Sequence, residues 1–186
     1  MEIDTLIEEL IAREGGFVDH PADRGGATRW GVTEAVARAA GYRGAMRDYP
    51  QSAASGLYRA RYWLAPRFDA VAERAPRLAA ELFDTGVNMG TSVAAGFLQR
   101  ALTALNHNGR DYADIAFDGR IGPRTVAALD AFLDIRGSRG ETILLKAVEA
   151  MRGERYLRLA EQRPANEAFL YGWLANRLAD PKEDGR

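Results

Sequence analysis

Three residues near the start of the chain have the types and the spacing for acid–base chemistry. Glu14 precedes Gly15-Gly16, Asp23 follows nine positions later in a glycine-rich segment, and Thr28 comes five positions after Asp23. Hydrolysis of a glycosidic bond requires one carboxylic acid that protonates the leaving oxygen and a second carboxylate that acts on water or on the sugar. The segment supplies both carboxyl groups, together with a hydroxyl that could share a bound water.

A helix is predicted to position Glu14. Apolar residues recur at the spacing of one helical face, namely Ile3, Leu6, Ile7, Leu10 and Ile11. Gly15 and Gly16 end this helix, one of them in the left-handed conformation. Glu14 then falls in the last turn, where the backbone carbonyls carry partial negative charge. Burial against Phe17 or Trp30 would also disfavour the ionised form, and a general acid must carry its proton.

Each of these residues also has an ordinary structural explanation. Glu14 alone is explained as a solvated residue at a helix end. Asp23 before Arg-Gly-Gly is a common turn former, and Thr28 could be an N-cap or a strand residue. The paired glycines favour the functional interpretation, because they allow the close backbone approach that a ligand-binding loop needs. The ordered set is therefore a stronger signal than any one of its members.

The opening segment resembles that of glycoside hydrolase family 108, phage-type N-acetylmuramidases that hydrolyse peptidoglycan. The matching stretches are Glu-Gly-Gly-Phe at 14–17, residues 19–26, and Thr-Arg-Trp-Gly-Val at 28–32. The spacing is also similar to that of the lysozymes of T-even phages, with one residue fewer between Asp23 and Thr28. The resemblance implies that Glu14 is the catalytic acid and that Asp23 and Thr28 position the water. It also implies cleavage of the β-1,4 bond between N-acetylmuramic acid and N-acetylglucosamine, without a cofactor.

The resemblance continues along the chain. Tyr58-Arg59, Tyr62-Trp63 and the stretch from Asp84 to Gly90 are similar to family segments, with Met89 departing from the pattern. Residues from about 92 to 178 resemble a peptidoglycan-binding segment. The expected substrate-binding residues are Trp30, Tyr62, Trp63, Asp84 and Asn88. Sugar rings stack on aromatic side chains, and the i, i+4 spacing of Asp84 and Asn88 would place both on one helical face over the cleft. The alternatives are that Tyr62 and Trp63 belong partly to the core and that Asn88 only caps its helix.

The periodicity predicts a mainly α fold, with at most a small β-hairpin near residues 17–32 and the active-site loop, and the resemblance implies that this helical fold is lysozyme-like. Helices are expected at about 33–41, 52–63, 76–88, 93–105, from Pro123 onward, 140–162 and 166–178. We expect a catalytic muramidase segment over 1–90 and a helical peptidoglycan-binding segment over 91–179, packed on the first. A flexible tail is expected over 180–186.

Composition narrows the chemistry. The chain has no cysteine and only two histidines, so neither a zinc site of several His and Cys ligands nor a thiol nucleophile is expected. These absences argue against zinc amidases and cysteine peptidases. Hydrophobic residues make up 47% of the chain, and no run approaches a membrane span.

Charge and the opening residues suggest the partner and the location. The net charge is −1, but residues 24–67 contain eight arginines against Glu34 and Asp48, which would steer the protein toward an anionic polymer. Peptidoglycan is expected rather than nucleic acid, because no nucleic-acid motif is present, and the protein is expected to be a monomer. The acidic start and amphipathic first stripe predict no signal peptide. Synthesis in the cytoplasm and holin-type release to the periplasm are therefore expected.

Two other functions remain open from the sequence. A lytic transglycosylase also uses one glutamate but closes an anhydro ring without water. A non-catalytic peptidoglycan-binding or phage-assembly protein could keep the same fold. The intact set of Glu14, Asp23 and Thr28 disfavours the second alternative, because a binding protein needs no acid.

Overall fold

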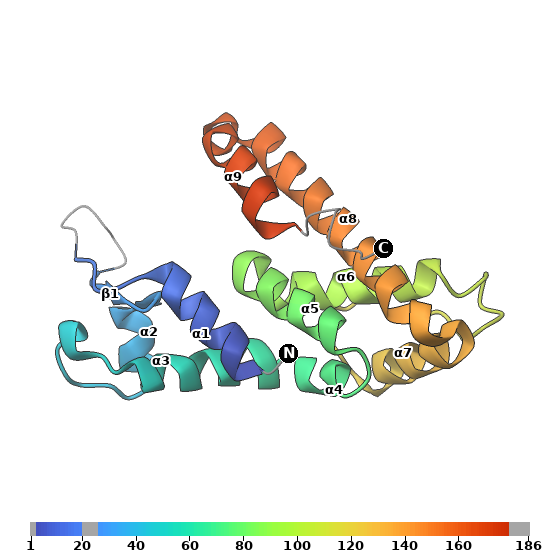
Figure 1. Cartoon of the computed structure of the whole chain (residues 1–186), viewed down its shortest axis with the longest axis horizontal. Coiled ribbons are helices and arrows are strands. Elements are labelled where there is room, and N and C mark those ends of the chain that lie inside the picture. The colour runs from blue at the N-terminus through green and yellow to red at the C-terminus, as the bar shows by residue number, and fades with distance from the viewer. Residues whose placement is uncertain (1–2, 20–25, 179–186) are drawn as a thin grey trace. The chain divides into compact units, whose positions relative to one another are not determined.

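The computed structural model describes residues 3–19 and 26–178 of the chain (Figure 1). The fold is mainly α, as the sequence predicts, and the sheet in the described part has two short antiparallel strands. Asp23 and the expected flexible tail, 180–186, lie outside the described residues. None of the described helices is both long and apolar enough to cross a membrane.

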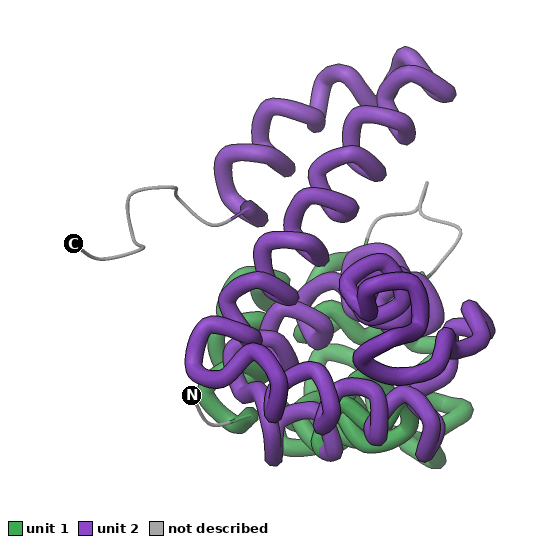
Figure 2. Tube along the Cα trace, turned by 90° about the vertical axis from the view of Figure 1, so that its right-hand side faces the viewer, with its two compact units in different colours: residues 1–69 green, residues 70–186 purple. Residues whose placement is uncertain are grey.

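The chain divides into two compact units, residues 1–69 and 70–186, which Figure 2 colours separately. Unit 1 contains α1 (Ile3–Glu14), β1 (Thr28–Arg29), β2 (Val32–Thr33), α2 (Glu34–Ala39), η1 (Met46–Asp48), α3 (Gln51–Tyr58) and the π-helical turn η2 (Arg59–Leu64). Helix α4 (Phe68–Ala72) spans the division. Unit 2 contains α5 (Pro76–Met89), α6 (Thr91–Ala104), α7 (Pro123–Arg136), η3 (Gly137–Arg139), α8 (Gly140–Gln162), η4 (Pro164–Asn166) and α9 (Glu167–Arg177). The segment boundary expected at residue 90 stays a prediction.

Helix α1 is the element that carries Glu14. It buries Ile7, Leu10 and Ile11 and packs on α3, so the predicted apolar stripe faces the core of unit 1. Gly15 ends the helix with φ at 79°, and its N–H donates to the Ile11 carbonyl at 3.2 Å. This left-handed end is the one expected from the glycine pair. Glu14 is thereby fixed as the last helical residue.

A small hairpin follows α1, as predicted near residues 17–32. Thr28 pairs with Thr33 and Arg29 with Val32, and the two strands are joined by Trp30-Gly31. Both turn residues have positive φ, 55° and 72°, the combination that two-residue hairpins favour because its twist matches that of the strands. The strand pair then leads directly into α2, whose N-terminus is capped by the Thr33 hydroxyl.

Unit 2 is built mainly from α5, α6 and α8, with α7 packed against α6 and α8. Its fully buried side chains include Leu78, Leu82, Leu98, Leu102, Phe132, Leu144 and Val148. Pro76 and Pro123 begin α5 and α7, where a missing N–H costs nothing. Helix α9 buries no residue fully. Trp173 is half-buried, with its ring centroid 5.4 Å from that of Tyr156 and 6.2 Å from that of Phe169.

Candidate active site

Glu14, the hairpin turn and the end of α3 meet at one place in unit 1. A methyl group placed on Gly31 would lie 3.0 Å from the Glu14 Cγ and 2.3 Å from the Tyr58 hydroxyl oxygen. Because such contacts are too short for a side chain, this packing requires glycine at position 31. The side chain of Glu14 is exposed, rather than buried against Phe17 or Trp30. Its carboxyl group is therefore open to a ligand on the surface.

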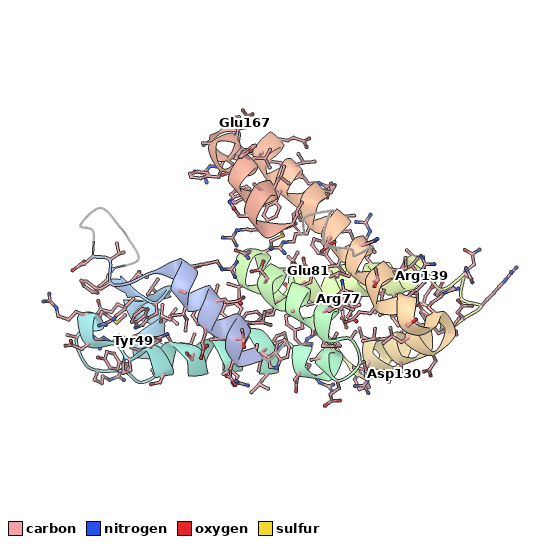
Figure 3. The ribbon with its side chains drawn as sticks, in the orientation of Figure 1. Tyr49, Arg77, Glu81, Asp130, Arg139 and Glu167 are labelled. Carbon is pink, nitrogen blue, oxygen red and sulfur yellow. The ribbon has the colours of Figure 1, made fainter. Side chains whose placement is uncertain are left out.

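The turn beside Glu14 is strained and is held by side-chain hydrogen bonds. Trp30 has φ of 55°, a region that costs a bulky residue about 1–3 kcal/mol. Its indole N–H donates to the Tyr49 carbonyl at 3.0 Å, and its own carbonyl accepts from the Tyr58 hydroxyl at 3.2 Å. Figure 3 labels Tyr49 in this unit. Strain that persists under such restraint is typical of functional sites.

Tyr58 is a site residue that the sequence reasoning did not select. It is 5% exposed, and burial raises its pKa to about 12, with further contributions from Glu14, Tyr62 and Tyr49. The phenol is thus neutral at neutral pH and keeps the proton that it donates to Trp30. Tyr58 and Gly31 both stood within the resembling motifs, and that was the one signal that could have found them.

The two neighbouring aromatic candidates differ in exposure. Both lie in the π-helical turn η2, where the Ala65 N–H donates to the Ala60 carbonyl at 2.9 Å; such turns are rare and are often found at functional sites. Tyr62 is half-buried, with its ring 5.8 Å from that of Tyr58. Trp63 is only 8% exposed, so most of its surface is buried in the core, as the alternative interpretation of this residue predicts.

The other two catalytic candidates lie around the first loop. Thr28 is in β1, and its backbone exchanges two hydrogen bonds of 2.8 Å with Val18. The Thr28 hydroxyl is 3.5 Å from the Gly26 carbonyl oxygen, a long contact that leaves it available to another partner. Val18 and Thr28 pair on either side of the segment that contains Asp23, which lies outside the described residues. The water-positioning roles of Asp23 and Thr28 stay predictions.

Asp84 and Asn88 belong to α5 in unit 2. The Asn88 amide donates to the Asp84 backbone carbonyl at 2.7 Å and to its carboxylate at 3.3 Å, so the two residues share one helix face, as their spacing predicts. The carboxylate of Asp84 is also ion-paired with Arg152 of α8. Contact of either residue with substrate stays a prediction.

Arg152 is the centre of a buried ionic network. Its side chain is 1% exposed and lies 2.8 Å from the carboxylate of Glu81, which Figure 3 labels on α5. Burial raises the pKa of Glu81, although the guanidinium opposes this shift. For Arg152, the carboxylates of Glu81 and Asp84 outweigh burial and raise its pKa. These partners are 68 to 71 positions apart in the chain, so no local pattern could reveal them.

The arginines of residues 24–67 have varied surroundings. Arg38 is ion-paired with Glu34 at 2.7 Å, and Arg59 is ion-paired with Asp4. Two others lie over aromatic rings: the Arg29 Cζ is 5.1 Å from the Trp30 ring centroid, and the Arg47 Cζ is 5.8 Å from that of Phe17.

Comparison with known proteins identifies both parts of the chain. Residues 7–90 match the family model described as glycosyl hydrolase 108, and residues 93–178 match a model described as a predicted peptidoglycan domain. Both matches confirm the family relationships predicted from the motifs, and together they support a peptidoglycan hydrolase. No curated protein matches the chain.

A solved structure also has a similar fold. It is titled "Structure of Brucella abortus SagA" and is 22% identical, with a TM-score of 0.61. The likeness covers 94% of this chain and 88% of that one. At this level of identity it shows the fold alone.

Proposed function

We propose that this chain, whose residues 7–90 match the glycosyl hydrolase 108 family model and whose residues 93–178 match the peptidoglycan-domain model, is an N-acetylmuramidase. The bond that it cleaves is the β-1,4 bond between N-acetylmuramic acid and N-acetylglucosamine. No cofactor takes part in this reaction as we propose it.

One observation carries the proposal: the position of Glu14. Its carboxyl group is exposed at the end of α1, against the Trp30-Gly31 turn that Tyr58 and Tyr49 restrain. A general acid must reach the leaving oxygen and must be held in one place. The α1 end, the glycine contact and the restrained turn supply this positioning. Glu14 is therefore assigned to protonation of the glycosidic oxygen.

Asp23 and Thr28 complete the proposed mechanism. Asp23 acts as the base that takes a proton from the attacking water, and the Thr28 hydroxyl helps to hold that water. Such a water needs space between the two carboxyl groups, about 6.5–9.5 Å in inverting glycosidases. The products are then expected to have the inverted, α configuration. Trp30 and Tyr62 supply the aromatic surface for the sugar rings.

The deciding experiment compares Glu14→Gln with Glu9→Gln. Both changes remove one carboxylate from an exposed position of α1, so they change the charge of the helix by the same amount. Glu14→Gln is expected to lower lysis of purified peptidoglycan by about 10²–10⁴-fold, whereas Glu9→Gln keeps the activity of the wild-type protein. Retention of more than about a tenth of that activity, with unchanged thermal melting, would remove Glu14 from the mechanism.

Mass spectrometry of the released fragments tests the reaction class. Reducing N-acetylmuramic acid ends are expected. A 1,6-anhydromuramic product would replace the muramidase proposal by a lytic transglycosylase. Binding to the wall without any release of fragments would indicate the non-catalytic alternative.

We also propose a setting for this activity: lysis of a bacterial host by a phage or phage-like particle. The enzyme would be made in the cytoplasm and would reach the wall from the periplasm through a holin-type pore. Expression in bacteria with and without a holin tests this setting. Lysis is expected only when both proteins are present, and lysis by the enzyme alone would contradict it.

A further inference from the structure

A hollow of about 250 Å³ lies in unit 2, where the end of α6, the end of α7 and the start of α8 come together. Its apolar wall includes Leu105, Phe132 and Ile143, and its polar rim is formed by His107, Arg136 and Arg139. Figure 3 labels Arg139, which directly precedes α8. Nothing in the muramidase mechanism uses this place.

The loop at one side of the hollow is held in a fixed conformation. Asn106 is 1% exposed; its amide donates to the Asp114 carboxylate at 2.6 Å and the Tyr112 carbonyl at 3.2 Å, and accepts from the Gly109 N–H at 3.0 Å. Within this frame His107 has φ of 54°, a left-handed conformation that persists only under such restraint. The fixed loop keeps His107 at the rim.

The rim carries more positive than negative charge. One edge of the Arg136 guanidinium donates to the Asp111 carboxylate at 2.7 Å, and its Cζ is 5.9 Å from the Phe132 ring centroid. Arg139 is exposed, and its side chain has no hydrogen bond or ion pair with any residue that the structure describes. Two guanidinium groups thus stand against one carboxylate. Because a guanidinium binds carboxylates with two parallel hydrogen bonds, the rim suits an anionic group.

Peptidoglycan offers two chemically different parts to such a hollow. Its sugar rings need open aromatic faces and several polar partners, but Phe132 is 1% exposed and cannot serve as a stacking surface. Its stem peptides carry carboxylates next to methyl groups of alanine. The apolar wall with a cationic rim complements the peptide rather than the sugar.

We propose that this hollow binds the stem peptide of peptidoglycan, with a peptide carboxylate on Arg139 and Arg136 and an alanine methyl group against Leu105 and Ile143. The inference rests on the proposed function, since it takes the wall polymer as the ligand. It assigns recognition of the peptide to unit 2 and explains how that unit would distinguish a peptide-bearing strand from bare glycan.

The test uses the full chain and N-acetylmuramyl-L-alanyl-D-isoglutamine, which has no glycosidic bond to cleave. Calorimetric binding to the wild-type protein is compared with binding to Arg139→Gln and to Arg124→Gln. Arg124 is an exposed arginine of α7 outside the hollow, so both variants change the charge equally. Arg139→Gln is expected to weaken binding about tenfold, because a charge-assisted hydrogen bond is lost, and Arg124→Gln leaves it unchanged.

Two further ligands separate the sources of binding. Acetate and tri-N-acetylchitotriose are expected to bind far more weakly than the muramyl dipeptide, and to be insensitive to Arg139→Gln. The inference is overturned if the dipeptide binds the wild-type protein no better than the Arg139 variant, or if the sugar alone binds equally well.

Lysis of purified peptidoglycan, measured in parallel, keeps the two proposals apart. If the wild-type protein lyses peptidoglycan but does not bind the dipeptide, the hollow is not a peptide site and the proposed hydrolase function is retained. If it binds the dipeptide but does not lyse peptidoglycan, the peptide site is retained and the proposed hydrolase function is refuted.

Discussion

Substitution of Gly31 by alanine tests whether the turn positions Glu14. The added methyl group would lie 2.3 Å from the Tyr58 hydroxyl oxygen and 3.0 Å from the Glu14 Cγ. The Tyr58 ring is rigid and 5% exposed, so it cannot move without disturbing the core. The Glu14 side chain is exposed and can rotate away. Both the stability of unit 1 and the position of the acid should therefore change.

The cost in stability has two parts. Gly31 has φ of 72°, where an L-residue with a side chain costs about 1–2 kcal/mol. Displacement of Tyr58 removes its hydrogen bond to Trp30, worth about 1 kcal/mol. The sum is about 2–3 kcal/mol, which for a chain of this length corresponds to a fall in melting temperature of about 4–12 °C. A shift of the carboxyl group by about 1 Å would lower activity by about 10²-fold.

Gly41→Ala is the matched control for Gly31→Ala. Gly41 also has positive φ, 94°, but an added methyl group there would meet nothing within 4 Å. The Gly41→Ala variant should lose only about 1–2 kcal/mol of stability, the cost of the backbone conformation, and should keep full activity. Melting is followed by circular dichroism, and lysis of purified peptidoglycan is measured at a temperature where both variants are folded. If Gly31→Ala is as stable and as active as Gly41→Ala, the turn does not position Glu14.

Other changes test the remaining features. Because the pKa of Tyr58 is raised, its neutral phenol stabilises the fold below pH about 10, and this contribution is lost as the pH rises toward 12. Tyr58→Phe should therefore reduce the alkaline loss of unfolding free energy by up to about 2–3 kcal/mol. Urea unfolding at pH 9 and 11.5 measures this difference. Arg152→Met leaves the carboxylate of Glu81 buried without its cation, and thermal melting should show a loss of about 3–5 kcal/mol; a neutral result would mean that the network does not stabilise unit 2. Asp23→Ala should reduce turnover far more than Asp19→Ala, and the opposite order would give the water-positioning role to Asp19. NMR of the first products should show the α configuration, whereas β products or a covalent adduct on Asp23 would exclude inversion.

The local pattern of the sequence predicted most of the helices and several of their ends, although it did not predict α4. The apolar stripe of residues 3–11, the left-handed Gly15 and the prolines at 76 and 123 all appear where expected. The longest helix, expected at 140–162, is Gly140–Gln162. Helix formation depends on contacts within a few residues, and for this reason the sequence alone predicts it. The motif that carries Glu14 was visible for the same reason, since its residues are adjacent.

Tertiary structure decided the surroundings of the acid. The Tyr58 hydroxyl reaches the Trp30 carbonyl across 28 positions, and the contact at Gly31 depends on how α3 packs against α1. The left-handed Trp30 could not be foreseen either, because local sterics disfavour this conformation in a bulky residue; the hairpin turn and hydrogen bonds to distant residues together hold it. The pairing of Arg152 with Glu81 and Asp84 likewise comes from the packing of α8 on α5. The spacing of residues along the sequence predicts each helix or strand separately. These contacts join different elements, and the relative placement of those elements is fixed by burial of their apolar faces.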